Sequence, residues 1–178
     1  MNIQKAFKLS LLIVTIIVAL IFIAGMATPA RWEVSSVRAM NASPNQIATT
    51  VSTPTTWPEW TPWTEEKYPD MTRDFGGPSS GPGASMSWHD GSMAGTITMT
   101  ESNSPLVVRY NLDLDSGRFL MECGFDIAPQ GAGSQVTWFC RGDSGSNPIQ
   151  RLMMKLLFAP MMRGDFDTGL ENLANFSD

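Results

Sequence analysis

The stretch that decides the fold is residues 106–140, which read LVVRYNLDLDSGRFLMECGFDIAPQGAGSQVTWFC. Within it, apolar residues alternate with polar ones along three runs, 106–114, 119–127 and 136–140. A period of two is typical of antiparallel strands with one buried and one wet face. The stretch therefore predicts three consecutive antiparallel strands around which the rest of the domain is built.

Working outward, further strands are predicted at 32–40, 71–75, 84–88 and 95–101, which gives about six to seven in all. Ser43 followed by Pro44 predicts the start of a short helix that ends near residue 51. After the last strand, apolar residues recur at three- and four-residue spacing from 149 to 173, which predicts a long terminal helix that Pro160 should kink or break. The order indicates an α+β fold.

Residues 9–27 read LSLLIVTIIVALIFIAGMA and contain no charged residue. Nineteen residues at ~1.5 Å each nearly match a hydrocarbon core of roughly 30 Å. Lys5 and Lys8 precede the run, so we expect a cytoplasmic tail (1–8), a transmembrane anchor (9–27) and an extracytoplasmic domain (28–178). The alternative is a cleaved signal peptide, but the run exceeds the ~7–15 apolar residues usual there.

Composition narrows the class of protein. The chain has 178 residues, of which 43% are hydrophobic and 16% charged, so it holds one domain besides the apolar segment. From position 28 onward, 10 basic residues stand against 17 acidic ones, a formal charge of −7. Such a surface repels phosphate backbones and argues against nucleic acid as a partner.

The two cysteines, Cys123 and Cys140, lie on the apolar sides of neighbouring predicted strands. The connection between these strands centres near residue 131 or 132, which sets the two cysteines opposite each other. Beyond a membrane they could form a disulfide, whereas the alternative is two free, buried thiols. Two sulfurs without a nearby histidine do not complete a metal site, and neither a metal nor a cofactor is expected.

Several motifs together resemble a known family. They are Ala42-Ser43-Pro44, Trp57-Pro58-Glu59-Trp60-Thr61-Pro62-Trp63, Gly81-Pro82-Gly83-Ala84 with Trp88 and Gly91, Gly95, Gly133-Ser134-Gln135-Val136-Thr137-Trp138, and Phe166 with Gly169-Leu170 and Leu173. The chain resembles the START-like (SRPBCC) superfamily with its helix-grip fold, in its polyketide cyclase/dehydrase-like branch, over about residues 30–176. It departs from that branch at Ser134, where relatives usually have Thr, and in the Met-rich neighbourhood of Pro160.

The resemblance implies a curved antiparallel sheet wrapped around the last helix, with a cavity between them for an apolar small molecule or lipid. One interpretation of Trp57, Trp60 and Trp63 is an aromatic lip at the mouth of that cavity. We favour the other interpretation, that they plug the end of the sheet as core, because the neighbouring prolines fix the loop. The other candidate lining residues are those predicted on the concave face: Met86, Trp88, Met99, Tyr110, Phe119, Met121, Phe125 and Trp138.

The sequence shows no pattern of residues typical of a catalytic site. The only histidine, His89, is expected in an exposed turn, and the charged residues of the central strands fall on the wet face. With no predicted inward acid–base pair, we favour binding over an enzyme, and Tyr110 is the best candidate should a cyclase, aromatase or hydratase reaction occur. A third hypothesis is a structural or partner-binding envelope module with a filled core.

Residues 152–162, LMMKLLFAPMM, are nearly all apolar. One interpretation is a membrane-surface or lid helix that passes ligand between bilayer and cavity. We favour the other interpretation, that the segment is the core-packed first half of the terminal helix.

Overall fold

The computed structural model describes residues 3–91, 93–104 and 106–177, so the first two residues of the predicted tail lie outside it. The chain divides into two compact units. The first comprises Met1–Trp32 with Asp143–Pro160, and the second comprises Glu33–Gly142 with Met161–Asp178.

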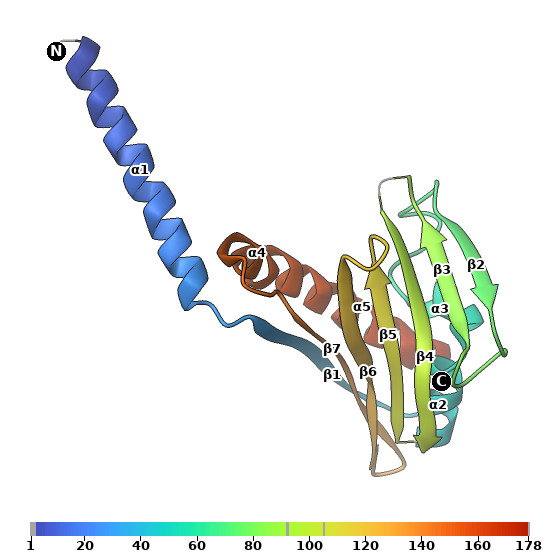
Figure 1. Cartoon of the computed structure of the whole chain (residues 1–178). Helices are drawn as coiled ribbons and strands as arrows, with labels where there is room; N and C mark the ends of the chain where they lie inside the picture. Colours follow the sequence, from blue (N-terminus) through green and yellow to red (C-terminus); the bar gives the residue numbers. More distant parts are fainter. Residues whose placement is uncertain (1–2, 92, 105, 178) are drawn as a thin grey trace. The chain divides into compact units, whose positions relative to one another are not determined.

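The second unit contains most of a seven-stranded sheet in the order β1-β7-β6-β5-β4-β3-β2 (Figure 1). From β2 to β7 each strand pairs antiparallel with the next. The strands are β1 (Arg31–Met40), β2 (Thr72–Gly76), β3 (Ser85–His89), β4 (Ala94–Ser104), β5 (Val107–Leu114), β6 (Phe119–Gln130) and β7 (Gly133–Asp143). The α+β fold and the strands expected from the period of two are confirmed.

The alternation of burial follows the predicted faces. On β5 the buried residues are Val108, Tyr110, Leu112 and Leu114, and β6 continues the same face with buried Met121, Cys123, Phe125 and Ile127. Apolar side chains on this face are removed from water where they pack against the C-terminal helix. This burial is the main source of stability in such a layer.

The hairpin between β6 and β7 is tight: Gln130 pairs with Gly133 across two residues, and Gly131 has φ of 61°. This register places Cys123 opposite Cys140, as the turn position predicts. Gly133 allows a close approach to β1, because a Cβ there would lie 2.0 Å from the Met40 carbonyl oxygen. The neighbouring Ser134 hydroxyl is buried and donates to the Ala42 carbonyl oxygen at 2.7 Å, which ties β7 to the residues that follow β1.

Helix α2 (Pro44–Val51) of the second unit begins where the sequence predicts. In α2, Ser43 caps the amino terminus by accepting from the Gln46 amide, and proline occupies the first turn. The proline-rich segment that follows forms two short turns, η1 (Pro54–Thr56) and α3 (Trp57–Trp60). The long helix α5 (Ala159–Ser177) lies across the sheet, with buried Phe166, Leu170 and Leu173.

The first unit holds α1 (Ile3–Ala27), α4 (Pro148–Met153) and the π-helical turn η2 (Met154–Phe158). Asn147 caps α4 by accepting from the amides of Ile149 and Gln150. Of the kink or break predicted at Pro160, the break does not occur, since α4, η2 and α5 follow one another without a gap. A proline removes one helical hydrogen bond and crowds the carbonyl four residues earlier, and the wider π turn accommodates this change.

Two glycines of α5 offer a matched test of the packing. A Cβ at Gly169 would lie 2.6 Å from Cζ3 of Trp138, whereas one at Gly164 would meet nothing within 4 Å. We predict that Gly169→Ala lowers the free energy of unfolding by ~1–3 kcal/mol through overpacking. Gly164→Ala should raise it by ~0.5–1 kcal/mol, because alanine is the better helix former. Chemical denaturation of the full chain in detergent measures both, and equal effects would contradict the packing described.

Candidate functional site

Seven aromatic rings meet between the sheet and α5, all within the second unit. This aromatic cluster comprises Trp57, Trp60, Trp63, Tyr110, Phe125, Trp138 and Phe166. Trp138 is its centre: its indole stacks on Phe166 with centroids 4.2 Å apart and on Phe125 at 5.0 Å. Trp57 meets Trp138 and Tyr110 edge to face, at 6.2 and 5.1 Å. Stacked and edge-to-face contacts of this kind add to the energy of burial itself.

Local structure places the two inner tryptophans. Trp57 and Trp60 are three residues apart on α3, so both project from the same side of a single turn, and both are fully buried. The Trp57 indole N–H donates to the Val51 carbonyl oxygen at 3.0 Å, which ties α3 to the end of α2. These two residues therefore lie within the core of the second unit, the interpretation favoured for them from the sequence.

Trp63 lies at the edge of the aromatic cluster and is half-buried. Its N–H donates to the Asp165 carboxylate at 3.3 Å, and the Arg73 guanidinium donates to its carbonyl oxygen. Lys67 pairs with the same carboxylate at 3.6 Å. Of the three tryptophans predicted at the mouth of a cavity, this one alone is partly open to solvent and bordered by polar groups.

The remaining predicted residues divide into two groups. Met86, Met99 and Met121 are buried on the inner face of the sheet. Trp88 and Phe119 are half-buried and, within the described part of the chain, make no ring contact with the aromatic cluster: Trp88 lies over Gly95, and Phe119 lies under the Arg118 guanidinium. Phe166 was not among the predicted site residues, although the helical stripe of residues 166, 170 and 173 already marked it as facing the sheet.

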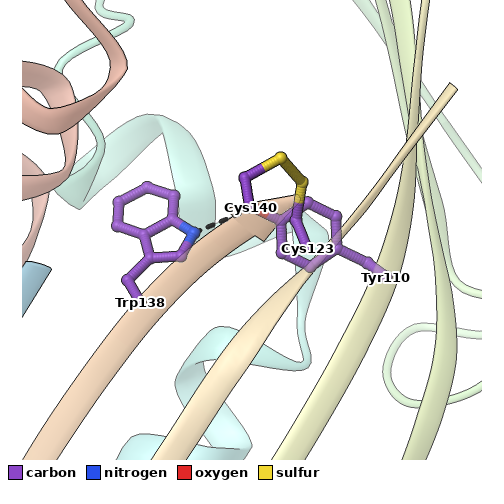
Figure 2. Close-up of a disulfide and its surroundings, with 4 residues drawn as sticks. All are labelled: Tyr110, Cys123, Trp138 and Cys140. Carbon is purple, nitrogen blue, oxygen red and sulfur yellow. Dashed lines mark hydrogen bonds between the residues drawn. A yellow bond between two sulfur atoms is a disulfide. The ribbon is translucent and has the colours of Figure 1, made fainter. Parts of the chain in front are cut away.

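The polar side-chain groups inside the aromatic cluster are few: the indole N–H groups, which only donate, and the Tyr110 hydroxyl, which both donates and accepts. The Trp138 N–H donates to the Tyr110 hydroxyl at 2.9 Å (Figure 2). Burial raises the pKa of Tyr110 far above its ordinary value, only partly opposed by this hydrogen bond, so the hydroxyl stays protonated. Among the described residues, its proton has no acceptor, and the buried Trp60 N–H has no partner. Two buried donors are therefore uncommitted, an arrangement that is costly unless something accepts from them.

A disulfide borders the aromatic cluster. Cys123 and Cys140 lie opposite each other on β6 and β7, with Cα atoms 4.0 Å apart, and their sulfurs are bonded. Tyr110 pairs with Cys123 in the sheet register, so the disulfide lies beside the Tyr110–Trp138 hydrogen bond, as Figure 2 shows. The bond links the two strands that supply Phe125 and Trp138.

The outer face of the sheet carries the charges, as predicted, but in pairs. Arg109 pairs with Asp126, and Arg141 pairs with Glu122, which raises the pKa of the Arg141 guanidinium. Both guanidinium groups lie over the ring of Phe139, with the Arg109 group 4.9 Å from its centroid. His89 is exposed at the end of β3, as expected.

An antiparallel sheet that packs one face against a long carboxy-terminal helix defines the helix-grip class. The chain belongs to the family described as polyketide cyclase / dehydrase and lipid transport, whose model matches residues 31–176. The comparison with curated proteins finds no match.

Solved structures agree on the fold. Protein CV1439 from Chromobacterium violaceum is 14% identical, with a TM-score of 0.58, covering 82% of this chain and 96% of its own. The KanY protein is 17% identical, with a TM-score of 0.62 and coverage of 83% and 97%. The Aha1 dimer from Colwellia psychrerythraea is 13% identical, with a TM-score of 0.58 and coverage of 82% and 96%. At these identities the likeness concerns the fold alone.

The disulfide can be tested directly. Replacing both cysteines by alanine opens a loop with a sequence separation of 17. Loop-closure entropy predicts a loss of ~3 kcal/mol in the free energy of unfolding for a loop near this length. Denaturation of the double variant measures the loss, and intact-mass spectrometry after alkylation without reductant checks the bond. Alkylation of both thiols in the unreduced chain would show that the bond does not form.

Tyr110→Phe tests the buried hydrogen bond, because it leaves the Trp138 N–H without its acceptor. We predict a loss of ~1–3 kcal/mol at neutral pH, and a much smaller effect for Tyr68→Phe, outside the aromatic cluster. Since burial raises the Tyr110 pKa, its stabilising contribution is present below the unfolded tyrosine pKa of ~10 and falls above it. The advantage of the native chain over Tyr110→Phe should therefore shrink in denaturation curves above about pH 10; a constant difference would contradict the assignment.

Proposed function

We propose that this protein is a membrane-tethered helix-grip domain that binds an apolar molecule carrying a hydrogen-bond acceptor, such as a lipid or a polyketide-like ring compound. The observation that carries the proposal is the pair of uncommitted buried donors, Trp60 N–H and Tyr110 O–H, inside an otherwise apolar cluster. A ligand with a carbonyl, ether or hydroxyl oxygen would satisfy them while its hydrocarbon part replaces water at the rings. Membership of a cyclase/dehydrase and lipid transport family supports this class of ligand.

Binding without transformation fits the site better than catalysis. Proton transfer needs a group whose pKa lies near the working pH. Tyr110 is the one titratable side chain among the aromatic cluster residues, and burial holds it protonated. It therefore serves as a donor that orients a ligand, and a cyclase-, aromatase- or hydratase-like reaction would need an acid–base pair that the cluster residues do not provide.

The tether in this proposal is α1. Its residues Phe7–Ala27 are long and apolar enough to span a membrane, with a mean hydropathy of 2.9, a test that a signal sequence also passes. An uncleaved anchor is supported by the packing inside the first unit. Gly25 is so close to Pro148 that a Cβ would lie 2.3 Å from the Pro148 carbonyl oxygen, and Arg151 donates to the Thr28 carbonyl oxygen. The proposed orientation has the amino terminus in the cytoplasm and the domain on the far side, and Lys5 and Lys8 before the apolar run support it.

A structural or partner-binding module with a filled core is the second candidate function. It is favoured by the packing of seven rings against one another, with Trp57, Trp60 and Trp138 fully buried. Under this alternative, the aromatic cluster only stabilises the packing of the sheet on the helix, and the two unpaired donors lower the free energy of unfolding.

Native mass spectrometry of the full chain released from its own membranes separates these two functions. We expect a reproducible bound molecule, with occupancy lowered about five- to tenfold by Trp60→Phe, which keeps a ring but removes the N–H donor. Trp32→Phe, in the first unit, is the matched control and should leave occupancy unchanged. A chain that is empty in every preparation would establish the filled core and end the ligand-binding proposal.

A further inference from the structure

The helical segment 148–158 exposes a row of large apolar side chains. Ile149, Met153, Leu156 and Leu157 are 55%, 55%, 63% and 65% exposed. Successive members of this row are four, three and one residues apart in the sequence, which places them along one side of the helix. The interpretation of residues 152–162 as a core-packed half of the terminal helix is therefore wrong for Met153, Leu156, Leu157 and Met161, although Met154 and Met162 are buried. The apolar side chains of segment 148–158 that are buried or half-buried are Pro148, Leu152, Met154 and Phe158.

The rest of this segment is held against the end of α1, within the first unit. Phe158 meets Trp32 edge to face at 5.7 Å, and the Ser144 amide donates to the Ala30 carbonyl oxygen at 2.9 Å. Arg151 bridges two backbone stretches, donating to Gly145 at 2.8 Å and Thr28 at 3.3 Å. Figure 1 shows α4 beside the carboxyl end of α1. The apolar row is thereby fixed next to the residues where the candidate span ends.

The charges of this segment differ from those of the domain as a whole. Residues 144–162 contain Arg151 and Lys155 and no acidic residue, whereas the chain from position 28 onward carries −7. Lys155 is exposed in the middle of the apolar stretch. A long lysine stem lies along apolar surface while its ammonium group reaches the headgroups, and anionic lipids attract such cations.

We propose that segment 148–158 is a second membrane contact, lying in the headgroup and upper acyl region of the bilayer that α1 crosses. This inference rests on the tether of the proposed function. The position of the segment beside α1 favours lipid as the partner of the apolar row. A membrane span that ends at residue 27 puts the residues packed against that end at the bilayer surface. There, apolar side chains are buried among acyl chains and basic groups meet the headgroups. The same helix continues into α5, which carries Phe166 of the aromatic cluster.

Site-specific fluorescence in nanodiscs tests this contact on the full chain. A bimane label is attached to Leu156→Cys, the native cysteines being engaged in their disulfide. Nanodiscs that contain anionic lipid and a doxyl-labelled lipid then report its depth. We expect a blue-shifted emission that loses roughly half of its intensity to the doxyl group, as for a probe ~5–10 Å into the interface.

Two further labels separate the possible failures. Leu120→Cys, on β6 and 67% exposed, is the matched control and should be neither shifted nor quenched. Ile13→Cys in α1 reports the tether itself. Quenching at residue 13 without quenching at 156 overturns the second contact and leaves the tether standing, whereas no quenching at 13 overturns the tether of the proposed function. A third outcome is a blue shift at residue 156 that the doxyl lipid does not quench and that disappears in nanodiscs holding a single copy of the chain. That outcome would assign the apolar row to contact with a second copy and would also overturn the proposal.

Discussion

The stacking of the Trp138 indole between Phe125 and Phe166 joins the sheet to the C-terminal helix, and the rest of the second unit depends on it. It requires a glycine at 169, because any side chain there would meet the indole. It requires Tyr110 two strands away, because the buried indole N–H needs an acceptor. The disulfide across β6 and β7 lies beside that hydrogen bond and fixes the relative position of the two strands that supply the stacked rings.

This one arrangement also frames the question of function. A cluster of seven rings is an effective core, yet two buried donors within it have no acceptor among the described residues. A purely structural core gains nothing from such donors, since each costs desolvation without a compensating bond. A ligand that supplies an acceptor would pair with these donors and remove the desolvation cost. This is the physical reason for preferring binding over a filled core, in a family associated with lipid transport.

Much of the fold follows from local pattern. The alternation along residues 106–140 predicted the central strands, and the centre of the β6–β7 turn predicted that Cys123 faces Cys140. The Ser43-Pro44 start predicted α2 to the residue. The candidate site was predicted less well. Trp57 and Trp60 are core, as favoured from the sequence, but Trp88 covers a glycine on its own sheet and lies away from the aromatic cluster. The placement of such a side chain is set by long-range packing and not by spacing along the chain.

By itself, the sequence determined the α+β class, the strand faces, the register of the cysteine hairpin and the apolar span, since each depends on residues near one another in the chain. Only the tertiary structure decided which donors remain unpaired and that the helix continues through Pro160 by way of a π turn. It also decided that the apolar row at 149–157 faces outward rather than into the core. These outcomes depend on which segments, distant in the sequence, compete for the same space and the same hydrogen-bond partners. The spacing of residues along the chain carries no information about that competition.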